Sequence, residues 1–303
     1  MASIRSRLLY FIMKNRHLLQ FRLQQEGWDC NTSVEDFRML CAKGNPAKLP
    51  EGIKVLPLQI DGMYAEWIIP GEAGKDRVIL YCAGGGYISG CCDDHRGFVA
   101  KLARQCGVTV LLFDHRLAPE DPFPAALEDT LSAYSWLLNQ SVLPAKIVIA
   151  GESAGGGLCL AALLALRDQD LPLPAAAVAI APWTDLALTG ESHKTMARYC
   201  LSPRGMSGVC ARYYAGDHDP CLPYISPLYG DLQGLPPLLI NVGEWDCLMS
   251  DSTRFAEKAK TAGVDVTLRV GTEMVHCYPL LAPLFPEASA AMQEICTFIR
   301  SHI

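Results

Sequence analysis

Eight short runs of apolar residues recur along the chain, and the later ones are apolar at nearly every position. A strand buried on both faces has this composition. The stretches between the runs, such as 97–105 and 125–139, have helical character. Strands that alternate with helices predict an α/β fold, in which helices cover both faces of a mostly parallel central sheet of about eight strands. The predicted strands are 53–58, 65–69, 77–81, 108–113, 146–150, 175–180, 237–242 and 264–270.

Two segments depart from this alternation and predict a helical cap. Residues 186–225 lie between two predicted strands and are richer in polar, aromatic and turn residues. Near the N-terminus, helical spacing relates Ile4, Leu8, Phe11, Ile12, Leu19 and Leu23. Such a helix covers a pocket or lies on a lipid surface, and apolar side chains on both of its faces favour the covering role. We therefore predict a main domain of 46–185 and 226–303, with a cap formed by 1–45 and 186–225.

The segment 146–155 ends in Gly-Glu-Ser-Ala-Gly, a G-x-S-x-G pattern centred on Ser153. It follows a β-branched apolar run and precedes small apolar residues, which predicts a buried strand, a sharp turn and a helix. In such a turn the serine backbone is strained, and glycines are needed because strand and helix nearly touch. The Ser153 hydroxyl would project above the sheet, beside the Ala154 N–H at the start of the helix.

A serine nucleophile needs a histidine base and an acid that orients it. In sheets of this type the order along the chain is serine, acid, histidine, each on a loop after a strand. Asp246 follows the predicted strand 237–242, and His276 follows 264–270, so both fit that order. Glu244 and Asp251 are nearby alternatives to Asp246, although Asp251 is better suited to capping a helix or binding nearby backbone.

A triple glycine, Gly84-Gly85-Gly86, follows the predicted strand 77–81. Consecutive glycines let backbone N–H groups approach a tetrahedral oxyanion without interference from side chains. A phosphate-binding loop is the usual alternative, but no G-K-[ST] follows and no G-x-G-x-x-G opens the helix. The loop is therefore the candidate oxyanion hole.

The composition of the chain indicates which classes of binding partner and which cellular compartment to expect. The net charge of −6 provides no basic surface for nucleic acid. The thirteen cysteines include no C-x-x-C pair, so we expect no metal site. They are scattered along the chain, and we expect them to be buried thiols in a reducing cytoplasm. We also expect no cofactor. No apolar run is long enough to span a membrane. The N-terminal run is interrupted by Lys14, too soon for a signal peptide, so we predict a cytoplasmic protein.

These motifs together resemble the hormone-sensitive lipase family of α/β-hydrolases, in its bacterial carboxylesterase branch. The resemblance covers nearly the whole chain from about residue 50 onward and keeps the family order. Its blocks are the triple glycine, Asp114-His115-Arg116-Leu117-Ala118-Pro119-Glu120, Phe123-Pro124-Ala125-Ala126, the Gly-Glu-Ser-Ala-Gly-Gly elbow, Ala181-Pro182-Trp183-Thr184-Asp185, Ile225-Ser226-Pro227-Leu228 and Leu235-Pro236-Pro237-Leu238.

The resemblance implies roles for individual residues. Ser153 would be the nucleophile, His276 the general base and acid, and Asp246 its orienting partner. Oxyanion donors would be the N–H groups of Gly85, Gly86 and Ala154. The reaction would be hydrolysis of short-to-medium acyl esters through an acyl-enzyme, in a cleft under a two-part cap. A non-catalytic small-molecule receptor on the same fold is the alternative, and the chain would be a monomer or a homodimer.

Two positions near the glycines bear on this reading. The family loop usually begins with histidine, and here that position is Ala83, which cannot form the side-chain hydrogen bond. We therefore expect the loop to be held by other contacts or to be more mobile than usual. Tyr87, directly after the glycines, would line the pocket, although packing in the core is the ordinary role of such a residue.

Overall fold

All eight predicted strands are present, in one sheet with the order β1-β2-β4-β3-β5-β6-β7-β8. The computed structural model describes residues 3–14, 28–29, 32–42, 49–197, 199–200 and 205–303. β2 pairs antiparallel with both β1 and β4. The six strands from β3 to β8 pair parallel with one another. The strands are β1 Ile53–Ile60, β2 Met63–Pro70, β3 Val78–Cys82, β4 Thr109–Phe113, β5 Ile147–Glu152, β6 Ala176–Ile180, β7 Leu238–Gly243 and β8 Val266–Gly271.

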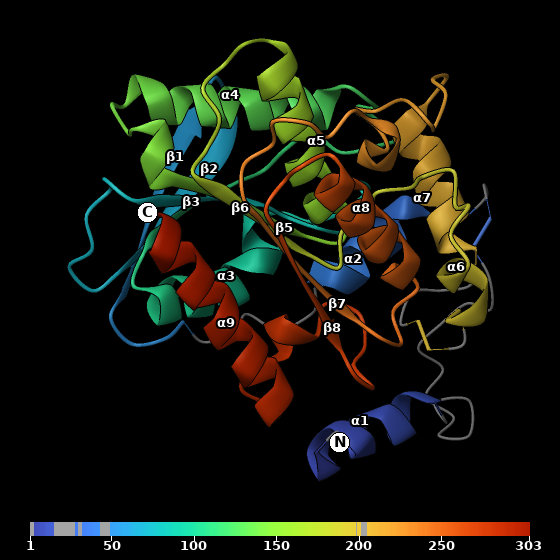
Figure 1. Cartoon of the computed structure of the whole chain (residues 1–303). Helices are drawn as coiled ribbons and strands as arrows, with labels where there is room; N and C mark the ends of the chain where they lie inside the picture. The colour runs from blue at the N-terminus through green and yellow to red at the C-terminus, as the bar shows by residue number, and fades with distance from the viewer. Residues whose placement is uncertain (1–2, 15–27, 30–31, 43–48, 198, 201–204) are drawn as a thin grey trace.

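Helices cover both faces of the sheet, as the alternation predicts (Figure 1). On one face α4, α5 and α8 bury Leu127, Leu163 and Phe255 in the larger core, and on the other α3 and α9 bury Val99 and Ile295. The α-helices are α1 Ile4–Lys14, α2 Val34–Ala42, α3 Cys92–Cys106, α4 Ala125–Asn139, α5 Ala154–Asp168, α6 Ser192–Thr195, α7 Met206–Ala215, α8 Met249–Thr261 and α9 Pro286–His302. The short 3-10 helices are η1 Pro144–Lys146, η2 Pro227–Tyr229 and η3 Tyr278–Leu281.

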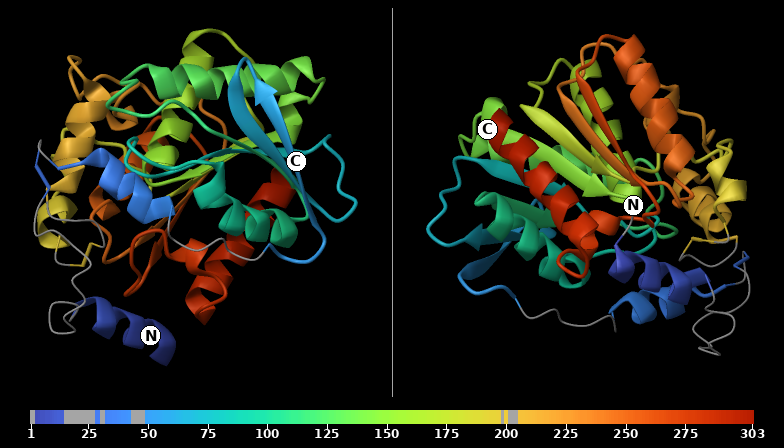
Figure 2. Two further views of the ribbon diagram at one scale, coloured as in Figure 1. Left: turned by 180° about the vertical axis from the view of Figure 1, so that it is seen from behind. Right: turned by 60° about the horizontal axis from the view of Figure 1, so that its bottom comes forward.

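Of the segments expected to form the cap, α6 contacts α8 and α2 contacts α3, and Figure 2 shows α2, α6 and α7 on the same side of the molecule. The first helix, α1, contacts the start of α9, where the Ser3 hydroxyl donates to Glu287. Ile4, Leu8 and Phe11 of α1 are 86%, 58% and 63% exposed. Leu19 and Leu23, which belong to the same sequence pattern, lie outside the described residues. Within the described ranges, no helix is both long and apolar enough to cross a bilayer.

The predicted strand, turn and helix around Ser153 are confirmed. β5 ends at Glu152, α5 begins at Ala154, and Ser153 between them has φ 55° and ψ −121°. Positive φ is rare in a residue with a side chain and stores strain. A Cβ atom at Gly155 would lie 2.1 Å from the Cys82 carbonyl oxygen, and one at Gly151 would lie 2.3 Å from that of Gly155. Glycine is thus the only residue that fits at either position.

We expect Gly155→Ala to lower the free energy of unfolding by about 3 kcal/mol, because the methyl group forces β3 and α5 apart in a packed core. Gly208→Ala in α7 is the matched control, since its nearest neighbour would be Leu188 Cδ1 at 4.0 Å. Alanine also favours a helix interior over glycine, so the control should be neutral or slightly stabilising. Urea unfolding of both variants measures the difference. Equal stability of the two variants would contradict the steric account.

Candidate active site

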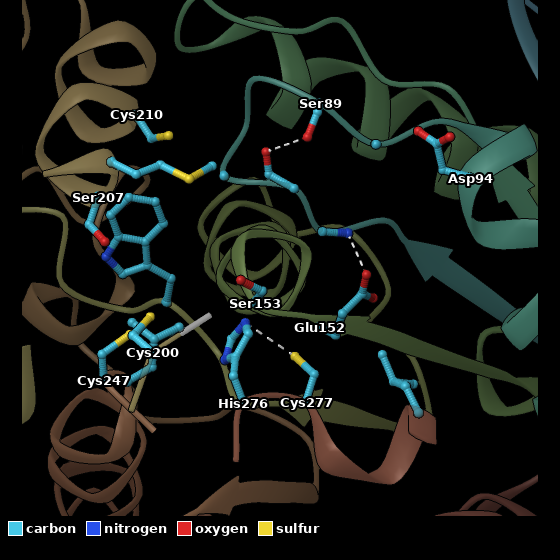
Figure 3. A pocket seen from close by; sticks show the side chains of 18 of the residues that line it. Ser89, Asp94, Glu152, Ser153, Cys200, Ser207, Cys210, Cys247, His276 and Cys277 are labelled. Carbon is cyan, nitrogen blue, oxygen red and sulfur yellow. Dashed lines mark hydrogen bonds between the residues drawn. The ribbon is translucent and has the colours of Figure 1, made fainter. Parts of the chain in front are cut away.

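Ser153, His276 and Asp246 come together at the carboxyl ends of β5, β8 and β7. Asp246 is fully buried, and its Oδ2 accepts a hydrogen bond from His276 Nδ1 at 2.8 Å. Asp246 Oδ1 accepts from the Leu248 N–H at 2.9 Å, which fixes the carboxylate. With Nδ1 held as the donor, Nε2 of neutral His276 is the basic nitrogen. Figure 3 shows the His276 ring and the Ser153 hydroxyl at the same cavity.

The His276 ring is held between a buried charge and a thiol. Burial by itself would lower its pKa, but the charge and hydrogen bond of Asp246, together with the contact to Cys277, outweigh burial and raise the pKa of His276 well above the usual value. Cys277 Sγ lies 3.4 Å from Nε2. Because burial raises the pKa of the Cys277 thiol, the sulfur stays protonated beside the ring. Nε2 therefore has the Cys277 thiol as a neighbour at the wall of the cavity.

The two alternative acids have other partners. Glu244 Oε2 accepts from the Glu273 N–H at 2.8 Å and so supports the loop that leads to His276. Asp251 Oδ2 accepts from the N–H groups of Thr184 and Asp185 at 3.1 and 3.0 Å, as the backbone-binding role of Asp251 predicted. His193 Nε2 lies 2.9 Å from the other oxygen of Asp251. Only Asp246, among these three carboxylates, contacts His276.

Two of the three expected oxyanion donors line the cavity, and the third directly follows Ser153 in the chain. Gly85 and Gly86 line it beside Ser153, with φ 126° and 67°, and Ala154 begins α5 directly after the serine. Within the described part of the chain, no acceptor is found for the backbone N–H groups of these three residues. N–H groups left without a partner at a cavity, one of them at a helix N-terminus, form a site for negative charge.

The glycine loop is held by contacts that replace the missing histidine at position 83. At its start, the Gly84 N–H donates to Glu152 Oε1 at 2.7 Å. His115 Nε2 lies 3.3 Å from the Ala83 carbonyl oxygen. At its far end, Arg38 Nε of α2 donates to the Ile88 carbonyl at 2.6 Å. The sequence predicted that other contacts hold this loop or that the loop is more mobile than usual. The structure contains such contacts.

Arg38 is a residue that the sequence patterns did not indicate. Its guanidinium binds both carboxylate oxygens of Glu120 at 2.8 Å and also donates to the Ala118 carbonyl. This pairing lowers the pKa of Glu120 to about 2. Arg38 lies in the N-terminal segment, outside the family blocks, and no motif surrounds it. Arg38 lies beside the glycine loop only in the folded chain, because 50 residues separate it from Ile88.

Tyr87 does not line the cavity. It is 2% exposed and stacks on Tyr214 of α7, with ring centroids 3.7 Å apart and planes 9° apart. Its φ of 64° turns the chain after the glycines, so that the side chain enters the core. The assignment of Tyr87 to the pocket is corrected accordingly, and packing is its role.

The cavity over Ser153 has a volume of about 320 Å³. Its walls combine the site loops with apolar side chains from the segments expected to form the cap: Phe37 of α2, and Met206 and Cys210 of α7. Trp183, Leu248 and Leu280 complete the apolar wall. In the described ranges, no group of three or more His, Cys, Asp or Glu side chains is arranged to hold a metal ion.

Comparison with known proteins agrees with the observed fold. A family model described as the alpha/beta hydrolase fold matches residues 79–280. An acetyl-hydrolase from Streptomyces hygroscopicus is 43% identical over 239 residues, 78% of this chain and 79% of that protein. An esterase from Acinetobacter venetianus is 34% identical over 251 residues, 82% of each protein.

Solved structures agree. An esterase of the bacterial hormone-sensitive lipase family has a TM-score of 0.90 and 40% identity, over 100% of this chain and 99% of that one. An esterase/lipase from an uncultured bacterium has a TM-score of 0.91 and 37% identity, over 99% of both chains. The chain belongs to the hormone-sensitive lipase family of α/β-hydrolases. It is a hydrolase of the esterase class.

The backbone contacts of Asp251 predict a large structural effect. We expect Asp251→Ala to lower the free energy of unfolding by about 3 kcal/mol, because two buried N–H groups lose their acceptor. Asp217→Ala, at an exposed turn, is the control and should change stability by less than about 0.5 kcal/mol. Chemical denaturation of both variants gives the comparison. A stable Asp251→Ala protein would contradict the assignment of Asp251 to backbone support.

Proposed function

We propose that the protein is a serine carboxylesterase that hydrolyses short-to-medium acyl esters through an acyl-enzyme. The observation that carries this proposal is the hydrogen bond of 2.8 Å between Asp246 and His276, at the cavity that contains the strained Ser153. This is the relation of base and orienting acid that acyl transfer requires, and Ser153 lines the same cavity.

The reaction would proceed in two steps. His276 Nε2 takes the proton of the Ser153 hydroxyl as Oγ attacks the ester carbonyl carbon, and a tetrahedral oxyanion forms. The intermediate collapses, the C–O bond to the alcohol breaks, and His276 returns the proton to the leaving alkoxide oxygen. Water then attacks the acyl-enzyme with His276 again as base, and the acid and free Ser153 are released. Asp246 stabilises the imidazolium in both steps.

The N–H groups of Gly85, Gly86 and Ala154 are proposed as the donors that stabilise the oxyanion. Their lack of acceptors in the described chain supports this role. Donors fixed in advance act on charge that develops in the transition state, and removal of one side-chain donor of this kind costs about 10²–10³ in kcat.

The cavity supports the proposed substrate size. Its volume of about 320 Å³ is near the lower end of small-molecule sites, which span about 300–1,000 Å³. We propose that 1–45 and 186–225 form the cap that limits acyl length, which Phe37, Met206 and Cys210 support as wall residues. α1 supplies none of the wall residues found within the described ranges, so a covering role for it remains a prediction.

The cysteines bear on the cellular setting. Cys82, Cys106 and Cys159 are thiols buried in the core, which supports a reducing cytoplasm. β8 lies at the edge of the sheet and offers one surface for a homodimer, although an edge strand of a monomer is equally consistent.

A series of p-nitrophenyl esters tests the function. We expect acetate and butyrate esters to be hydrolysed, with kcat/KM falling steeply for long acyl chains that exceed the cavity. Ser153→Ala should lower kcat by about 10⁴-fold or more, because the nucleophile is lost. Retained turnover in a folded Ser153→Ala protein would contradict the mechanism.

A receptor on the same fold would bind a ligand without turnover. An organophosphonate discriminates between the two, since it bonds covalently only to an activated serine. We expect stoichiometric labelling of Ser153, read by mass spectrometry of the labelled peptide, and no labelling after Ser153→Ala. Folded protein that resists labelling would favour the receptor.

The pH dependence follows from the raised pKa of His276. Its imidazolium persists to higher pH than a free histidine, so activity should be lost as pH falls through the raised pKa. Asp246→Asn removes the charge that raises this pKa, and the acid limb should move to lower pH. The same change should lower kcat by about 10⁴-fold, because the ring tautomer is no longer held. Asp265→Asn, on an exposed loop, is the control, and an unmoved acid limb in Asp246→Asn would contradict the pairing.

A further inference from the structure

Beside Ser153 lies a second buried carboxylate that the proposed mechanism does not use. Glu152 is 5% exposed and lines the active-site cavity. Its Oε2 accepts from the Tyr81 hydroxyl at 2.5 Å, and its Oε1 accepts from the Gly84 N–H at 2.7 Å. A Cβ atom at Gly84 would lie 2.8 Å from Oε1, so the loop backbone rests directly on the carboxylate. Glu152 thus fixes the start of the glycine loop.

A histidine on α3 completes the environment of this carboxylate. His95 Nε2 lies 2.9 Å from Glu152 Oε1, and His95 Nδ1 lies 3.1 Å from the Cys91 carbonyl oxygen. A carbonyl and an ionised carboxylate only accept hydrogen bonds, so both contacts form only when both ring nitrogens carry protons. The geometry therefore selects the imidazolium form, which pairs with Glu152 in a site where both side chains are nearly buried, 12% and 6% exposed.

The neighbours of His95 favour the same form. Burial by itself would lower the pKa of His95, but the charge and hydrogen bond of Glu152 outweigh it, and the pKa is raised. The Cys91 carbonyl and the Asp94 charge on α3 act in the same direction. Phe98 packs edge-on against the ring, and Tyr81 contacts both Phe98 and the Glu152 carboxylate.

We propose that His95 is a positioning residue of the esterase reaction: as an imidazolium it holds and neutralises Glu152, which in turn fixes Gly84 and the N–H groups that follow it. The neutralisation matters because an unpaired carboxylate at this wall would oppose the negative charge that develops on the substrate oxygen. The pair also supplies the support that Ala83 cannot. This inference rests on the proposed function.

The test compares His95→Leu, which removes both donors, with His95→Gln, which keeps one neutral donor near the position of Nε2. Steady-state kinetics with p-nitrophenyl butyrate give kcat and KM. A trifluoromethyl ketone, whose adduct with Ser153 carries an oxyanion, reports on transition-state stabilisation. The matched control is His302→Leu at the C-terminal end of α9, which lies outside the proposed cap and is not a wall residue of the cavity.

We expect His95→Leu to lower kcat about 100-fold, comparable to loss of one oxyanion donor. KM should change less than about threefold, and the inhibition constant of the ketone should rise in parallel with the loss of kcat. His95→Gln should recover about tenfold of the loss, and His302→Leu should match the native protein. In Glu152→Gln/His95→Gln, the combined loss should be smaller than the product of the single losses, because the pair acts as a unit.

Three results would overturn the proposal: native kcat in His95→Leu, a loss carried by KM alone, or unchanged ketone inhibition despite lower kcat. If His95→Leu fails to fold, His95→Gln and Tyr81→Phe carry the same comparison, since each removes one contact of the network. Native protein and Ser153→Ala separate the two levels of inference. If the native protein hydrolyses no ester, the proposed function itself fails; if it does and the His95 variants behave like it, only the role of His95 fails.

Discussion

At Gly155 the first turn of α5 approaches the end of β3 so closely that a Cβ atom there would lie 2.1 Å from the Cys82 carbonyl oxygen. β3 leads directly into the glycine loop, so the contact that seats Ser153 also sets the distance from the serine to the N–H groups opposite it. The strand register contributes to the same result, because Cys82 pairs with Gly151 across β3 and β5. The proposed nucleophile and the proposed oxyanion hole are thus positioned by the same close contact between α5 and β3. The strained φ of Ser153 persists because packing on both sides leaves the turn no alternative.

Three buried carboxylates near the site each face a histidine, and their chemistry differs through the surroundings of the pair. Asp246 faces His276, Glu152 faces His95, and Asp251 faces His193. His276 has its second nitrogen at the cavity, where it can exchange a proton with a serine or a leaving group. His95 has its second nitrogen on a backbone carbonyl, so the proton there is committed to a hydrogen bond. The other oxygen of Asp251 accepts hydrogen bonds from two backbone N–H groups. We therefore propose different roles for these similar pairs: catalysis for Asp246 and His276, loop support for Glu152 and His95, and folding for Asp251 and His193.

Much of the fold and the polar centre of the site could be predicted from the sequence. The strand patterns are local, and each of the eight strands appears within a few residues of its predicted range. Ser153, Asp246 and His276 could be selected because parallel strands bring their carboxyl ends to one edge, so order along the chain implies proximity in space. The prediction for Tyr87 is wrong because it depends only on the position after the glycines. The stacking partner of Tyr87, Tyr214, belongs to α7 and is distant in the sequence. Arg38 was missed because its partners lie 50 to 82 residues away.

The sequence by itself determined the sheet, the elbow and the order of the reactive groups, since these depend on apolar periodicity and on glycines that local sterics require. Only the tertiary structure decided which acid serves His276, because Asp246, Glu244 and Asp251 are chemically alike and differ in the partners that folding brings to them. It also decided how a loop without its usual histidine is held. That support comes from Glu152, His115 and Arg38, on three separate segments. Contacts between distant segments depend on packing, and no local pattern encodes them.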